Sequence, residues 1–164
     1  ISSNFNENQK VNFTIINKDE QKVTTLFSDQ AKPFVKKFDF IKGFEEGSLD
    51  FYSVESDNTS NSKLKIYDFK LKELPVLTKI LTLASLQGIA DLLSGEGIRF
   101  SEFEMNFKNK DTLMTIDEIY AIGPAISILM EGYIEKENLH GFESNIEFLH
   151  LTDKEIYEKL LRKG

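Results

Sequence analysis

Two histidines, His140 and His150, are the side chains best suited to metal binding or proton transfer in this chain of 164 residues, which has no cysteine. Neither histidine has neighbours at the spacing of a zinc motif such as H-E-x-x-H. His140 lies in an expected turn, and His150 precedes an expected helix cap. We therefore interpret both as exposed or satisfied histidines, and we expect no metal site and no cofactor.

Paired carboxylates are the second candidate for chemistry, because two neighbouring acids can act as general acid and general base. Glu102 with Glu104, and Asp117 with Glu118, form such pairs in the sequence. The first pair alternates with apolar residues, which is typical of a strand with one solvated face. We therefore expect these acids to lie on a solvated surface rather than in a catalytic site.

Serine nucleophiles and phosphate-binding loops are the remaining candidates. Ser85, Ser94 and Ser101 lack the G-x-S-x-G context of a nucleophile elbow. The segments Gly95-Glu96-Gly97 and Gly123-Pro124 form neither G-x-G-x-x-G nor a P-loop. The sequence therefore predicts a protein that is not an enzyme.

Composition narrows the possible partners. The formal net charge of −7 argues against nucleic-acid binding, which needs a basic surface. The chain has 14 Phe and no Trp, which suits a wide apolar surface without polar groups to satisfy.

A length of 164 residues suits a single domain, 1–164. Because the chain begins at Ile1, we interpret it as a fragment of a longer protein.

The stretch from Leu74 to Gly97 is the organising element that we expect, as a helix over about 75–94. Pro75 suits its first turn, and two glycines follow its last apolar pair. A membrane span is the rival interpretation, but Lys79 and Asp91 lie inside the window, so we expect no span. A helix that is apolar nearly all round must be buried. Its apolar positions include Ile80, Leu81, Ala84, Ile89, Leu92 and Leu93.

The flanking segments alternate as strands do. Val11, Phe13 and Ile15 predict a half-buried strand, and Ser28-Asp29 predicts the cap of a short helix. The apolar residues change from even to odd positions near Tyr67–Asp68, which predicts a β-bulge. Further predicted elements are a hairpin turn at 109–111, a strand at 113–121, a last strand with alternating apolar residues at 142–148 and a closing helix after Thr152. Together these features predict an α+β fold, with a curved, twisted antiparallel meander wrapped around the central helix.

Residues 81–100, Leu-Thr-Leu-Ala-Ser-Leu-Gln-Gly-Ile-Ala-Asp-Leu-Leu-Ser-Gly-Glu-Gly-Ile-Arg-Phe, resemble the AsmA-like C-terminal region of large Gram-negative envelope proteins of the YhdP and TamB type. Segments at 64–77, 103–107, 121–125 and 128–134 extend the resemblance over roughly residues 20–142. The chain departs from the pattern at 143–164, which is polar. The resemblance implies a β-groove that shields phospholipid acyl chains, in a periplasmic part of an inner-membrane-anchored parent that transports lipid and has envelope proteins as partners.

The groove that the resemblance implies would be lined by inward side chains of the strands. The candidates are Phe100, Phe107, Ile126, Ile128, Met130 and Phe148. The leading hypothesis is a non-enzymatic lipid-transport module. The alternative is a structural cap or protein-interaction domain whose groove is permanently plugged by the helix at 75–94.

Overall fold

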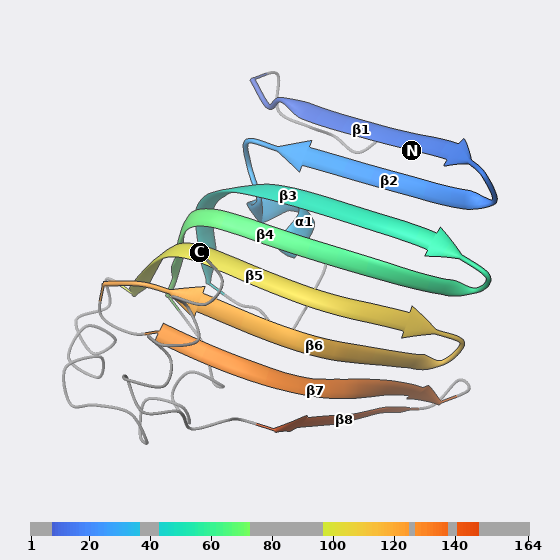
Figure 1. Ribbon diagram of the computed structural model, residues 1–164. Helices are drawn as coiled ribbons and strands as arrows, with labels where there is room; N and C mark the ends of the chain where they lie inside the picture. The colour runs from blue at the N-terminus through green and yellow to red at the C-terminus, as the bar shows by residue number, and fades with distance from the viewer. Residues whose placement is uncertain (1–7, 37–42, 73–96, 125–126, 138–140, 148–164) are drawn as a thin grey trace.

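The computed structural model describes residues 8–36, 43–72, 97–124, 127–137 and 141–147. These residues form one open antiparallel sheet of eight strands that follow one another in chain order (Figure 1). The elements are β1 Val11–Lys18, β2 Gln21–Ser28, α1 Lys32–Val35, β3 Phe44–Ser56, β4 Thr59–Leu71, β5 Ile98–Lys110, β6 Leu113–Ile122, β7 Ser127–Glu137 and β8 Gly141–Glu147.

Two-residue turns join β1 to β2 and β3 to β4 at one end of the sheet (Figure 1). Asp19 and Glu20 have φ angles of 51° and 62°, and Asp57 and Asn58 have φ angles of 48° and 60°. Two consecutive positive φ angles are the signature of the type I′ turn, whose twist matches that of the strands it joins. These turns therefore hold the strand pairs in register locally.

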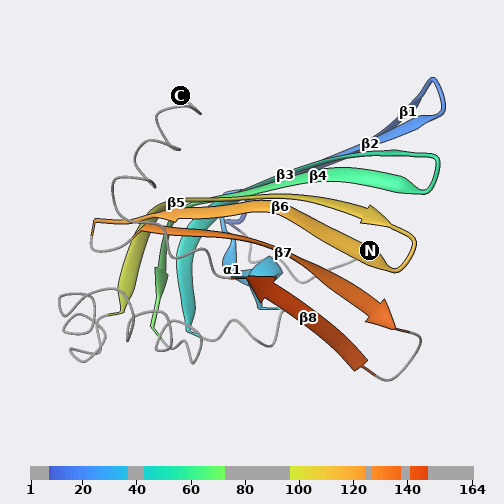
Figure 2. The same cartoon turned by 60° about the horizontal axis from the view of Figure 1, so that its bottom comes forward.

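The sheet bends along a line that crosses β3 and β4, and Figure 2 shows β3, β4 and β5 curving beside α1. On this line Glu46 and Gly47 have φ angles of 63° and 82°, and Asp68 has a φ angle of 51°. The pairing register between β3 and β4 is the same on both sides of the line. Ile66 and Phe69 are therefore both buried, at 6% and 3% exposure, although they are three residues apart.

The predicted β-bulge at Tyr67–Asp68 is wrong, because no residue is inserted there. The apolar side chains change from even to odd positions at Asp68, which has a positive φ angle, while the register stays the same. A residue is inserted on β6 instead, where the register to β5 shifts between Asn106 and Phe107. There Asn106 pairs with Glu118 and Phe107 pairs with Ile116, so one residue of β6 has no partner on β5. The insertion lets Ile116 and Ile119 both be buried.

The main core lies inside the bend. Phe69 stacks on Phe44 with ring centroids 5.3 Å apart, and on Phe100 with centroids 5.2 Å apart. Val35 of α1 and Ala31, which precedes it, belong to the same buried cluster at 4% and 0% exposure. Three neighbouring strands and one helical turn thus bury a ladder of phenylalanines.

The helix α1 is tied to the bend by its first residues. The Ala31 N–H donates to the Gly47 carbonyl oxygen at 2.7 Å. Ser28, which is fully buried, donates from Oγ to the Gln30 carbonyl oxygen at 2.8 Å. The predicted cap at Ser28-Asp29 is therefore misplaced: Ser28 holds a turn that leads into the helix, and Ala31 occupies the cap position.

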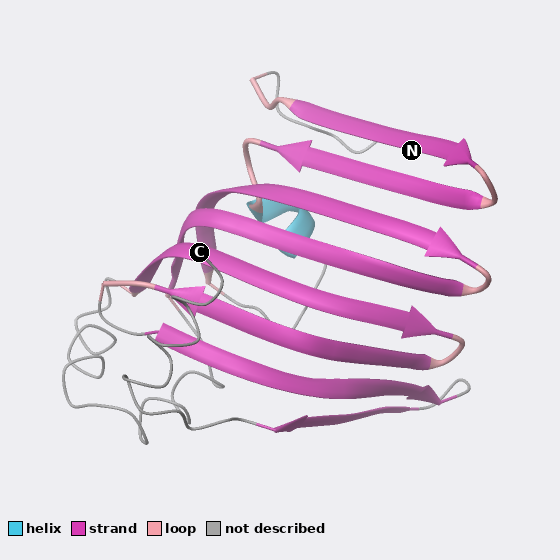
Figure 3. Ribbon diagram, in the orientation of Figure 1, coloured by secondary structure: helices cyan, strands magenta, loops and turns pink. Residues whose placement is uncertain are grey.

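The predicted α+β fold class is wrong. Apart from α1 and its turns, the described chain consists of antiparallel strands (Figure 3). The prediction rested on the apolar composition of 75–94, but the described sheet buries its phenylalanines by bending beside α1. Residues 73–96 and 148–164, which contain the predicted central and closing helices, lie outside the described residues.

Candidate functional site

One row of apolar residues crosses the sheet on the face that carries α1. Each residue of this central row lies directly opposite the next one on the neighbouring strand, and directly opposed residues share a face. From β1 to β6 the central row consists of Phe13, Leu26, Phe51, Leu64, Met105 and Ile119. The six strands therefore present a continuous apolar strip.

Burial differs between the central row and the row beside it. Leu49 and Ile66, one row nearer the bend, are 4% and 6% exposed and belong to the main core. In the central row Leu26, Phe51 and Leu64 are only half-buried and pack against that core. The central row is thus a partly open strip beside a closed core.

The central row is bordered by hydroxyl groups on the side of the tight turns. Ser53 and Ser62 lie opposite each other, and their Oγ atoms are hydrogen-bonded at 2.8 Å. Both side chains are buried, and the bond between them gives each hydroxyl oxygen a partner within the apolar face. Phe107 lies beside Ser62 in the same row, and its ring is 6.5 Å from the ring of Phe51.

The predicted groove residues have separate locations. Phe100 is 1% exposed within the phenylalanine ladder, whereas Phe107 is half-buried at the border of the central row. In β7 the register places Ile128 opposite Ala121 and Met130 opposite Ile119. Outside the described residues lie Ile126, Phe148, Ile80, Leu81, Ala84, Ile89, Leu92 and Leu93.

The site that the sequence prediction missed is the central row itself. Leu26, Phe51 and Leu64 were identifiable as apolar strand residues, but their alignment depends on register. The turn signal at Asp57-Asn58 would have set Phe51 opposite Leu64, because a two-residue hairpin defines the pairing of its strands.

The opposite face of the sheet carries a network centred on Glu104, which is only 6% exposed. Tyr120 donates to its Oε2 at 2.8 Å, and Asn106 donates to its Oε1 at 2.8 Å. Lys65 Nζ lies 3.2 Å from Oε2, and Lys63 Nζ lies 3.5 Å from Oε1. The predicted solvated position of Glu104 is therefore wrong, because residues of β4 and β6 surround it.

The network changes the titration of its members. Burial by itself would raise the pKa of Glu104, but hydrogen bonds from Asn106, Tyr120 and Lys65 outweigh it and lower the pKa to about 2. Burial, together with the hydrogen bonds to Glu104 and Glu102, raises the pKa of Tyr120 above its ordinary value. Glu104 is thus a fixed carboxylate and Tyr120 a fixed donor, which suits a structural role better than proton transfer.

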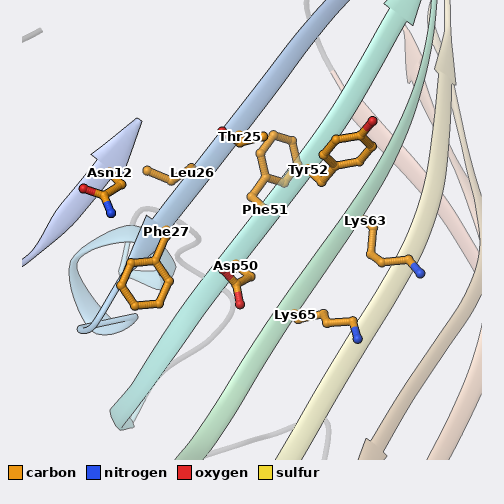
Figure 4. A pocket seen from close by; sticks show the side chains of 9 residues that line it. All are labelled: Asn12, Thr25, Leu26, Phe27, Asp50, Phe51, Tyr52, Lys63 and Lys65. Carbon is orange, nitrogen blue, oxygen red and sulfur yellow. The ribbon is translucent and has the colours of Figure 1, made fainter. Parts of the chain in front are cut away.

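A hollow of about 340 Å³ lies over β1 to β4 (Figure 4). Tyr52 and Phe27, which are 49% and 37% exposed, are its two exposed aromatic residues, and Lys65 is already paired with Glu104. The residues that line it are Asn12, Thr25, Leu26, Phe27, Asp50, Phe51, Tyr52, Lys63 and Lys65. Within the described ranges no three acidic or histidine side chains gather to hold a metal ion.

Comparisons with known family models, with curated proteins and with solved structures return no match. The resemblance to the AsmA-like region therefore stays a prediction. In the part of the chain that the structure describes, no helix has the length and apolar character needed to cross a membrane. The rival membrane-span interpretation of residues 74–97 concerns a stretch that lies mostly outside that part.

Proposed function

We propose that this domain binds phospholipid acyl chains along the central row and acts as a non-enzymatic module of lipid transport. The observation that carries the proposal is the unbroken apolar strip over β1 to β6, in which Leu26, Phe51, Leu64 and Met105 stay half-buried. An acyl chain laid over these side chains would remove apolar surface from water on both partners. Such burial contributes roughly 25 cal/mol per Å².

The dimensions of the strip support this ligand class. Six strands spaced about 4.8 Å apart give a strip roughly 24 Å long across the sheet. An acyl chain of one membrane leaflet covers about half of the roughly 30 Å hydrocarbon core. A whole chain therefore fits on the strip with its head group free to reach the solvent at an edge.

The resemblance of residues 20–142 to the AsmA-like region supports the cellular setting. It suggests lipid transfer across the periplasm by a longer, inner-membrane-anchored protein that has envelope proteins as partners. The apolar strip supports the lipid part of this proposal independently, because it needs no likeness to any other protein. The satisfied Glu104 network supports the non-enzymatic part.

Photo-crosslinking at two adjacent positions of β3 tests the proposal. A benzoyl-phenylalanine is placed at Phe51, on the central row, or at Tyr52, which is 49% exposed on the opposite face. Each variant is incubated with vesicles of phosphatidylethanolamine and phosphatidylglycerol, irradiated and analysed by mass spectrometry. We expect a phospholipid adduct at position 51 that exceeds the adduct at position 52 at least tenfold.

Equal labelling at both positions, or no adduct at position 51, would overturn the lipid proposal. The second outcome would favour a protein-interaction domain, because the central row would then be inaccessible to lipid. Transfer is measured separately with a pyrene-labelled phosphatidylethanolamine, whose excimer emission falls when single molecules leave a labelled vesicle. We expect the wild-type chain to speed this loss and Leu64→Asn to slow it relative to wild type.

A further inference from the structure

The strand β1 ends the sheet with exposed apolar side chains on both of its faces. Phe13 and Ile15 are 58% and 49% exposed on the apolar face, and Ile16 is 58% exposed on the other face. Among the described strands β1 pairs with β2 alone. One edge of its backbone therefore carries N–H and C=O groups that no described strand satisfies.

Between Val11 and Asn17 this edge lacks the features that usually prevent pairing with another chain, and the one lysine of β1, Lys18, stands at its end beside the turn. Edge strands are commonly protected by lysines, prolines or bulges. Residues 11–17, Val-Asn-Phe-Thr-Ile-Ile-Asn, contain no charge and no proline. The register of β1 with β2 is unbroken over eight pairs, from Val11 with Ser28 to Lys18 with Gln21, so β1 is a regular strand along its whole length.

We propose that two copies of this chain pair through β1, antiparallel about a twofold axis that passes between their Phe13 residues. In this register Phe13 lies opposite Phe13 of the second copy, and Val11 lies opposite Ile15. Asn12 lies opposite Thr14, which places short polar residues together on the other face. The apolar face of the strand is thus complementary to itself, as a twofold interface requires, and on the other face Lys10 lies opposite Ile16.

Neighbouring registers of the same kind are less favourable. An axis at Thr14 places Lys10 opposite Lys18 of the second copy, and like charges directly opposite each other are destabilising. An axis at Ile15 places Phe13 opposite Asn17, so an apolar residue faces a polar one. Only the axis at Phe13 pairs the three apolar residues of this face among themselves.

The pairing would join the central rows of the two copies. A twofold axis between antiparallel strands is perpendicular to the sheet, so both apolar faces lie on the same side. The exposed ring of Phe13, at the end of one central row, would contact the corresponding ring of the second copy. A single pair of edge strands is a small interface, so we expect association in the micromolar range. The inference does not depend on lipid binding.

Cysteine pairing tests the register, because the chain contains no cysteine of its own. Asn12→Cys and Thr14→Cys variants, one of them with an affinity tag, are oxidised alone and as an equal mixture. We expect the mixed disulfide dimer to exceed either self-dimer at least fivefold, because residue 12 lies opposite residue 14. A predominant Thr14→Cys self-dimer would overturn the register, and the absence of any dimer would overturn the interface.

Sedimentation of cysteine-free chains tests the interface without a crosslink. We expect wild type to be dimeric at 100 μM and Phe13→Lys to be monomeric, with an unchanged circular dichroism spectrum because Phe13 is exposed. The matched control is Leu113→Lys on β6, which removes another exposed apolar residue, 41% exposed, far from β1, and which we expect to stay dimeric. A monomeric wild type, a dimer that survives Phe13→Lys, or a ladder of larger oligomers from pairing of β1 with β8 would each overturn the proposal.

Discussion

Glu104 shows how a single buried charge can be fixed by its neighbours on a sheet face. Its side chain lies among two lysines, an asparagine and a tyrosine that come from β4, β5 and β6. A buried carboxylate without such partners would be strongly unfavourable. The partners instead keep it ionised, so the network joins three strands on one face of the sheet while the core forms on the other face.

The network predicts a specific pH dependence of stability. Because the pKa of Glu104 is about 2 in the folded chain and 4.5 ordinarily, its contribution is fully present above pH 4.5 and is lost as the pH falls towards 2. The shift corresponds to about 3 kcal/mol. We expect Glu104→Gln to lower the free energy of unfolding by about 1–3 kcal/mol at pH 7, with a difference from wild type that shrinks between pH 4.5 and pH 3. Urea unfolding at several pH values measures both effects.

Glu131→Gln on β7 is the control for this experiment, because Glu131 is exposed. Its unfolding free energy should run parallel to that of wild type over the same pH range. A Glu104→Gln profile that also runs parallel to wild type would contradict the role assigned to the network.

The bend is the element that gives the sheet its core. Positive φ angles at Gly47 and Asp68 reverse which face of the strands the odd-numbered and even-numbered side chains occupy, without changing the register. Apolar side chains on both sides of the bend therefore belong to the same core. A Cβ atom at position 47 would lie 2.9 Å from the Cβ of Phe69 and 2.9 Å from the Tyr67 carbonyl oxygen. Glycine is therefore required here by space as well as by its φ angle of 82°.

Substitutions at the bend should separate the requirement for space from the requirement for a positive φ angle. We expect Gly47→Ala to lower the free energy of unfolding by about 1–3 kcal/mol, because strain and a close contact coincide. Asp68→Gly should stay within about 1 kcal/mol of wild type, because glycine relieves the left-handed conformation but gains freedom in the unfolded chain. Chemical denaturation measures both values. Equal effects of the two substitutions would show that the bend places no special demand on position 47.

The hairpin between β3 and β4 offers a stabilising change. Asn58 occupies the second central position of a type I′ turn with a φ angle of 60°. Glycine is preferred at this position, so we expect Asn58→Gly to raise the free energy of unfolding by up to about 1 kcal/mol. Asn58→Val is the opposing control and should lower it, because a β-branched residue is strained at positive φ. The shift in the midpoint of thermal unfolding, relative to wild type, measures the effect of each substitution.

At the scale of the whole molecule, the described sheet is uneven in stability. Its largest buried cluster lies over β3 to β5 beside α1, whereas most of β1 is exposed on both faces. Regions with few buried apolar contacts open at low free energy. The edge that we propose for pairing is therefore anchored by fewer buried apolar contacts than β3 to β5.

Hydrogen exchange should follow this gradient. In dilute solution, below the concentration at which we expect the copies to pair, we expect amides of β4 and β5 to exchange slowly and amides of β1 to exchange faster than those of β4 and β5. The physical reason is that β1 can separate from β2 without opening the main core. Mass spectrometry of peptides after timed labelling measures the order. Slower exchange in β1 than in β4 would contradict the assignment of the core.

Local features of the sequence determined several strands and turns. Alternation at Val11, Phe13 and Ile15 identified β1, and the strand predicted at 113–121 matches β6, Leu113–Ile122, within one residue. The hairpin turn predicted at 109–111 falls at 111–112, because β5 continues to Lys110. Alternation is a local property of the backbone, since successive side chains of a strand point to opposite faces.

Only the tertiary structure decided which residues those strands bring together. The strand with Val11, Phe13 and Ile15 was predicted to be half-buried, but Phe13 is 58% exposed, because β1 lies at an edge of the sheet. Glu104 was assigned to a solvated surface but is buried, because β4 and β6 place Lys65 and Tyr120 beside it. Strand order and register arise from packing between segments far apart in the chain, so periodicity within one segment predicts a strand but not its neighbours. The bend illustrates the same point. The sequence showed that the apolar residues change from even to odd positions near Asp68. It did not show that Glu46 and Gly47, which also have positive φ angles, lie beside Asp68 on the neighbouring strand, so that the bend crosses both strands as one line.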